Sequence, residues 1–96
     1  MPRPLLSDDE IEQALAGVEW TRRDDAIERT VRLADFRAAM ICVNQVADVA
    51  NELNHHPDIS ISWNKVGLSV STHDSGGLTA LDFDLARAVD ALGQPG

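Results

Sequence analysis

The chain has 96 residues, of which 44% are hydrophobic and 25% are charged. This length predicts one domain over residues 1–96 with no separate cofactor-binding domain, and the composition is that of an ordinary globular protein. Sixteen acidic against eight basic residues give a formal charge of −8, so neither nucleic acid nor a membrane is expected as a partner. A cytoplasmic location is expected because no apolar export segment follows Met1 and a single cysteine, Cys42, is typical of a reducing compartment.

The N-terminal third predicts a helix followed by two strands. Ser7 and Glu10 have the spacing of a capping box, and apolar residues at helical intervals extend the helix over about residues 8–16. Residues 19–22 indicate a short strand that enters a turn. Apolar and polar side chains then alternate over residues 27–33, as in a half-buried strand.

The middle of the chain predicts the longest helix and then a hairpin. Apolar residues recur every three or four positions over residues 35–53, and Pro57 breaks this helix. Residues 59–63 and 66–70 alternate on either side of a short break, which favours a β-hairpin whose apolar face includes Trp63.

A last helix follows, with Thr79 and Asp82 as its N-terminal cap and its end expected at Gly93. The order helix, two strands, helix, two strands, helix predicts an α+β two-layer sandwich with the helices on one face of an antiparallel sheet. The core of so small a domain is thin, and self-association is therefore expected. The aromatic residues that could fill this core are Trp20, Phe36, Trp63 and Phe83.

All three histidines fall in two loops: His55 and His56 after the long helix, and His73 after the last strand. Histidine gives and takes protons near neutral pH, so this distribution favours acid–base chemistry. Two other interpretations stay open at this point. The histidines could have no function, or they could hold a metal ion with Asp74 or Asp82, although no recognised ligand spacing is present.

Several segments together resemble the pterin-4a-carbinolamine dehydratase family over most of the chain. They are His55-His56-Pro57-Asp58-Ile59, Trp63-Asn64-Lys65-Val66, Ser71-Thr72-His73-Asp74, Gly77-Leu78-Thr79 and Asp82. The resemblance implies four antiparallel strands with three helices on one side, and assembly into homodimers or homotetramers. It also implies dehydration of a 4a-hydroxytetrahydropterin to a quinonoid dihydropterin, in the recycling of tetrahydrobiopterin, without a metal or an organic cofactor.

The same resemblance implies roles for individual residues. His55 and His73 correspond to the acid–base groups, and the sequence leaves open which of them is the acid. The residues implied in substrate binding are His56, Ser71, Thr72, Ser75 and Asp82. Asp82 has a second interpretation, because an acidic residue at the third position of a helix caps its N-terminus whether or not it touches a substrate.

The chain departs from the family pattern at two positions near the histidine pair. Asn51 and Asn54 stand where acidic residues are expected, and neither is included in the predicted site. Two alternative functions also remain. One is a non-catalytic binding or assembly protein, as animal members of the family resemble a protein that stabilises a transcription-factor dimer. The other is a pterin enzyme of molybdopterin-linked metabolism.

Overall fold

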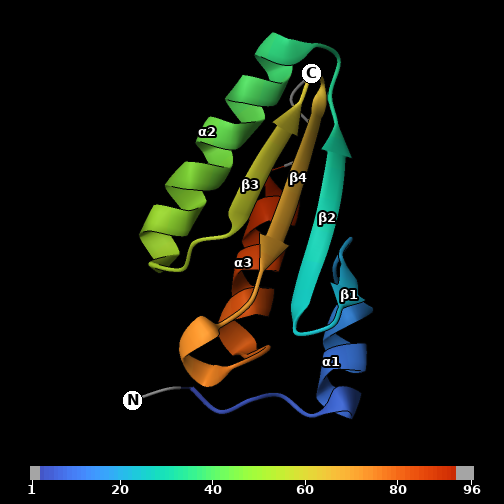
Figure 1. Ribbon diagram of the computed structural model, residues 1–96, viewed down its shortest axis with the longest axis vertical. Coiled ribbons are helices and arrows are strands. Elements are labelled where there is room, and N and C mark those ends of the chain that lie inside the picture. Colours follow the sequence, from blue (N-terminus) through green and yellow to red (C-terminus); the bar gives the residue numbers. More distant parts are fainter. Residues whose placement is uncertain (1–2, 93–96) are drawn as a thin grey trace.

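The computed structural model describes residues 3–92, so the predicted helix end at Gly93 lies outside the described residues. The elements, in chain order, are α1 (Asp8–Leu15), β1 (Thr21–Arg23), β2 (Ala26–Arg32), α2 (Phe36–Leu53), β3 (Asp58–Ser62), β4 (Lys65–Val70), the 3-10 turn η1 (His73–Ser75) and α3 (Ala80–Ala91) (Figure 1). This order confirms the α+β prediction. None of the helices in the described residues is long and apolar enough to cross a lipid bilayer.

The four strands form one antiparallel sheet in the order β1-β2-β4-β3. The central pair is β2 and β4, whose register places Ile27 opposite Val70 and Val31 opposite Val66. β3 pairs with β4 on the other side and forms an edge of the sheet. Both apolar rows of the central pair therefore point to the same face.

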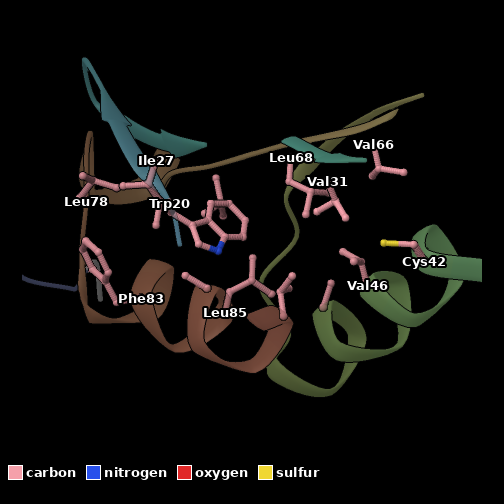
Figure 2. Close-up of a cluster of buried hydrophobic side chains, with 14 of the residues drawn as sticks. Trp20, Ile27, Val31, Cys42, Val46, Val66, Leu68, Leu78, Phe83 and Leu85 are labelled. Carbon is pink, nitrogen blue, oxygen red and sulfur yellow. The ribbon is translucent and has the colours of Figure 1, made fainter. Parts of the chain in front are cut away.

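The core lies between this face and the helices (Figure 2). Val31 and Leu68 of the sheet face Val46 of α2 and Leu85 of α3, and all four are buried. Ile11 of α1 belongs to the same cluster. All three helices thus contribute to one core on one side of the sheet, which confirms the predicted two-layer architecture.

Each helix begins at a residue whose side chain accepts a backbone hydrogen bond. Ser7 and Glu10 form the predicted capping box of α1. Asp35 caps α2 by accepting from the amide of Ala38 at 2.8 Å. Thr79 and Asp82 form the corresponding box at α3. These caps satisfy amides that have no partner within the helix, and each fixes the residue at which its helix starts.

Asp90 of α3 connects the helix layer to the segment before β1 and to β2. Its carboxylate accepts from Trp20 Nε1 at 2.9 Å and from the backbone amide of Glu19 at 2.8 Å. It also accepts from Arg29 of β2 at 2.6 Å, and that guanidinium reaches Glu19 as well. One acidic side chain therefore satisfies three donors from residues about 60 to 70 positions earlier in the chain.

The sequence predicted that four aromatic residues and the apolar face of the hairpin would be buried. This was wrong for two of the aromatic residues and for the outer strand of the hairpin, β3. Trp63 is 68% exposed and Phe36 is 52% exposed. Trp63 lies in the β3–β4 turn with φ 53°, beyond the last paired residue of β3, so strand alternation does not place it. Ile59 and Ile61 are 37% and 39% exposed because β3 is an edge strand.

Candidate active site

The end of α2 positions His55. Asn54 adopts a left-handed conformation with φ 51°, which ends the helix, and asparagine tolerates this region better than most residues. The amide of His55 then donates to the carbonyl of Ala50 at 3.1 Å. Pro57 follows two residues later, and its ring restricts His56 to extended conformations. The backbone that carries both histidines is therefore fixed by local chemistry.

His55 contacts a buried carboxylate from α3. Its Nε2 lies 2.6 Å from Oδ1 of Asp82, whose side chain has no solvent exposure. The second oxygen, Oδ2, accepts from the backbone amide of Thr79 at 2.8 Å and from Oγ1 of Thr72 at 2.9 Å. Asp82 thus caps α3 with one oxygen, as one of its two interpretations predicts, and contacts His55 with the other. Because Asp82 is fully buried, its carboxylate reaches solvent only through His55.

The turn after β4 positions His73. Thr72 and Gly77 form an isolated bridge, and the amide of Gly76 donates to the carbonyl of Thr72 at 3.0 Å. Gly76 has φ 77°, a conformation that residues with a Cβ rarely adopt. His73 is exposed, and the tight η1 turn sets its direction.

The N-terminal segment packs against this turn. The amide of Leu6 donates to the carbonyl of Leu78 at 2.9 Å, and Oγ of Ser75 donates to the carbonyl of Arg3 at 2.6 Å. The hydroxyl of Ser75 is therefore directed toward the N-terminal segment. The structure does not bring Ser75 to the cavity that the histidines line.

The two histidine loops meet at an open cavity of about 340 Å³. A volume of this size is at the lower end of the range of small-molecule sites. The lining residues are Asn54, His55, His56, Ser71, Thr72, His73, Asp74 and Leu81. Five of the seven predicted site residues are among them. Within residues 3–92, no group of three or more His, Cys, Asp or Glu side chains is placed to hold a metal ion.

A model of the family described as pterin 4 alpha carbinolamine dehydratase matches residues 4–92 of the chain. The chain belongs to the pterin-4a-carbinolamine dehydratase family. A relative from Nocardia farcinica is 48% identical over 93 residues, which are 96% of this chain and 98% of the relative. A relative from Roseiflexus castenholzii is 49% identical over 89 residues, covering 92% and 96% respectively. Both carry the name pterin-4-alpha-carbinolamine dehydratase provisionally.

Two solved structures share the fold. A transcriptional coactivator/pterin dehydratase from Brucella melitensis has a TM-score of 0.88 and 33% identity, covering 93% of this chain and 98% of that chain. A pterin dehydratase-like protein described as a RuBisCO assembly factor in the alpha-carboxysome has a TM-score of 0.64 over 82% and 92% of the two chains. Its identity is 15%, so it shows the similarity of the fold alone.

The structure adds residues that the sequence-based site left out, including both departures from the family pattern. Oδ1 of Asn51 lies 3.1 Å from Nε2 of His56, so an amide holds this ring. Asn54 lines the cavity, as do Asp74 and Leu81. The sequence could have indicated Asn51 as a site residue, because it lies in the last turn of α2, next to the histidine pair. Asn54 could have been found as the residue that ends the helix, because asparagine is common at that position.

Proposed function

We propose that this family member dehydrates a 4a-hydroxytetrahydropterin to a quinonoid dihydropterin and water by general acid–base catalysis. The observation that supports this most strongly is that His55 and His73, from two separate loops, line the same cavity of about 340 Å³. Imidazoles deliver and accept protons near neutral pH, and the reaction needs one group for each task. The family membership supports the same substrate class.

The reaction balances with two histidines and no other reactant. One imidazole accepts the proton of N5, the N5 electron pair forms the C4a=N5 double bond, and the C4a–O bond breaks. The other imidazole, in its protonated form, donates its proton to the departing hydroxyl, which leaves as water. A proton then returns from the first histidine to the second through solvent, which the open cavity admits.

Substrate binding is assigned to groups that remain free to face the cavity. His56 and Ser71 line it, and His56 is held by Asn51. The hydroxyl of Thr72 is already engaged with Asp82 and Thr79, so Thr72 contributes its backbone. Pterins carry an edge of ring nitrogens and one carbonyl, which hydrogen-bonds well to such a mixture of polar groups.

The charge of the cavity supports a pterin without a phosphate group. Its lining contains no lysine or arginine, and Asp74 adds an acidic side chain. The formal charge of the whole chain is −8, which repels anions at a distance. This favours a tetrahydrobiopterin-type substrate over a phosphorylated pterin of molybdopterin-linked metabolism. A purely non-catalytic assembly role is disfavoured because it gives no reason for three histidines around one cavity.

We also propose that the chain forms a homodimer or homotetramer through the free edge of β3. The segment Asp58–Ser62 is self-complementary about Ser60, because antiparallel pairing with a second copy places Ile59 opposite Ile61 of that copy. This pairing would cover two exposed isoleucines and satisfy the open backbone edge. Sedimentation of Ile61→Lys should give a monomer and that of the wild type a larger species. A control variant, Thr30→Lys on an inner strand, should sediment like the wild type.

The experiment that tests the proposed reaction compares three proteins at equal concentration. The wild type should accelerate the loss of 4a-hydroxytetrahydrobiopterin, followed by absorbance, whereas His73→Ala should be slower by about a hundredfold or more. Asn44→Ala, on an exposed position of α2, should match the wild type. Circular dichroism checks that each variant is folded. A folded His73→Ala with full activity would remove His73 from the mechanism.

A further inference from the structure

We propose that Thr72 and Thr79 are positioning residues that hold Asp82, and that the carboxylate held in this way determines which nitrogen of His55 faces the substrate as a proton acceptor. The inference rests on the proposed function and adds to it an assignment of the acid and the base. It starts from a buried chain of hydrogen bonds that ends at His55. The members of this chain are Thr79, Thr72 and Asp82, of which Thr79 and Asp82 have no solvent exposure and Thr72 is 7% exposed.

The direction of each hydrogen bond in this chain can be assigned. An ionised carboxylate only accepts, so the single hydroxyl proton of Thr72 goes to Oδ2 of Asp82, at 2.9 Å. The hydroxyls of Thr72 and Thr79 are 2.8 Å apart, and Thr79 must be the donor because the proton of Thr72 is already used. The oxygen of Thr79 accepts in turn from the amide of Leu81 at 3.3 Å. Every hydrogen bond therefore points toward Asp82.

The oxygen of Asp82 that the threonines leave unoccupied fixes the proton on His55. Oδ2 of Asp82 is saturated by Thr72 and by the amide of Thr79, and Oδ1 is left to face His55 at 2.6 Å. Since Oδ1 accepts, Nε2 of His55 carries the proton. The neutral ring then has its lone pair on Nδ1, to which no other group of residues 3–92 donates. Nδ1 is the nitrogen available to a molecule in the cavity.

The assignment separates the two catalytic histidines. His55, with Nδ1 as acceptor, takes the N5 proton of the carbinolamine. His73 lies in the exposed η1 turn and has no side-chain partner in the described residues, so its ring is free to exchange protons with solvent and to donate to the leaving hydroxyl. The threonines act only through Asp82 and touch no substrate with their hydroxyls.

Nitrogen-15 NMR of the imidazole rings tests this directly, because protonated and unprotonated ring nitrogens have well-separated chemical shifts. In the wild type, with His55 neutral, we expect a protonated Nε2 and an unprotonated Nδ1. Asp82→Asn should reverse this pattern. The donors Thr72 and Thr79 hold the amide oxygen on their side, so the amide NH₂ faces His55 and Nε2 must accept. A wild-type ring with its proton on Nδ1 would overturn the inference.

Variants of Thr72 test the hydroxyl itself. Thr72→Val keeps the shape but removes the hydrogen bond, and kcat should fall about tenfold with little change in KM. Thr72→Ser keeps the hydroxyl and should restore most of the rate. Thr30→Val, on the exposed face of β2, is the matched control and should behave as the wild type. Equal loss in Thr72→Val and Thr72→Ser would show that packing, and not the hydroxyl, matters.

The outcomes separate this inference from the proposed function. The NMR pattern does not depend on turnover, so an inactive wild type with a protonated Nε2 would reject the dehydratase function and leave standing the orientation of His55 by the Asp82 carboxylate that Thr72 and Thr79 hold. An active wild type with the proton on Nδ1 would keep the function and reject the positioning role.

Discussion

Nε2 of His55 and Oδ1 of Asp82 are 2.6 Å apart, although the two residues are separated by 27 positions in the chain. The end of α2 supplies the histidine and the first turn of α3 supplies the carboxylate. The same carboxylate caps α3, so the start of that helix and the orientation of the imidazole depend on one side chain. A buried charge needs such partners, because an unpaired carboxylate in the core is strongly destabilising.

Asn51→Ala should weaken substrate binding without slowing the chemical step. Asn51 is the hydrogen-bond partner of His56, which we assign to binding. Loss of this contact leaves the exposed ring free to rotate, so KM should rise about three- to tenfold while kcat stays within about twofold. Steady-state kinetics measure both, with Asn44→Ala on the same helix as control. A fall in kcat at unchanged KM would place His56 in the chemistry instead.

Gly76→Ala should destabilise the turn that carries His73. Gly76 has φ 77°, where an added Cβ costs about 1 kcal/mol, although open space surrounds the position. Urea denaturation should show this loss, and activity should fall because His73 is displaced. Gly17→Ala is the matched control, since Gly17 has no positive φ and its Cβ would make only ordinary contacts. Equal stabilities for the two variants would contradict the role of the turn.

The parts of the fold that the sequence predicted well depend on neighbouring residues. The capping boxes of α1 and α3 involve residues three positions apart, and the alternation of β2 and β4 reflects two faces with different surroundings. Strand order is a long-range property. The alternation of Ile59 and Ile61 identifies an apolar face, but only the position of β3 at the sheet edge explains why both remain exposed.

Asp90→Ala should lower the free energy of unfolding by about 2 to 4 kcal/mol. The change removes the acceptor of the indole NH of Trp20 and one of the two acidic partners of Arg29, and Trp20 is only 4% exposed. Chemical denaturation followed by Trp fluorescence measures the effect. Asp84→Ala, in an exposed pair with Arg87 on the same helix, should cost less than about 0.5 kcal/mol. Similar losses of unfolding free energy in the two variants would show that the hydrogen bonds of Asp90 do not stabilise the fold more than an exposed ion pair does.

The thiol of Cys42 should react slowly in the folded protein. Burial raises the pKa of this thiol above its ordinary value, and the positive charge of Arg29 offsets only part of that effect. Less thiolate is then present at pH 8, and the side chain is 6% exposed, so labelling with a disulfide reagent should be at least about tenfold slower than in urea. Equal rates in both conditions would contradict the burial.

The same pKa direction predicts how stability depends on pH. The folded protein keeps the proton of Cys42 at pH values where the unfolded chain releases it. The free energy of unfolding should therefore be insensitive to this group below the ordinary pKa of a thiol and should fall as the pH rises through it. In Cys42→Ala the free energy of unfolding should fall less steeply with pH in the alkaline range. An unchanged alkaline dependence would show that other groups cause it.

The sequence predicted those parts of the candidate site that depend on short motifs, as it did for the fold. Motifs identified His55, His56 and His73, and the structure brings all three to one cavity. The hydrogen bonds that connect Thr72 and Thr79 to Asp82 form because the turn after β4 packs against the start of α3. The spacing of residues in the sequence does not reveal this contact. Asn51 was left out because it departs from the family pattern, although its amide still holds His56.

The most direct test of the account is the rate of quinonoid dihydropterin formation from 4a-hydroxytetrahydrobiopterin, measured by stopped-flow absorbance with and without the wild-type protein. We expect an acceleration proportional to protein concentration and well above the spontaneous rate. It should be lost in a folded double variant, His55→Ala with His73→Ala. A folded wild type that leaves the spontaneous rate unchanged would contradict the proposed reaction and favour a binding or assembly role for this fold.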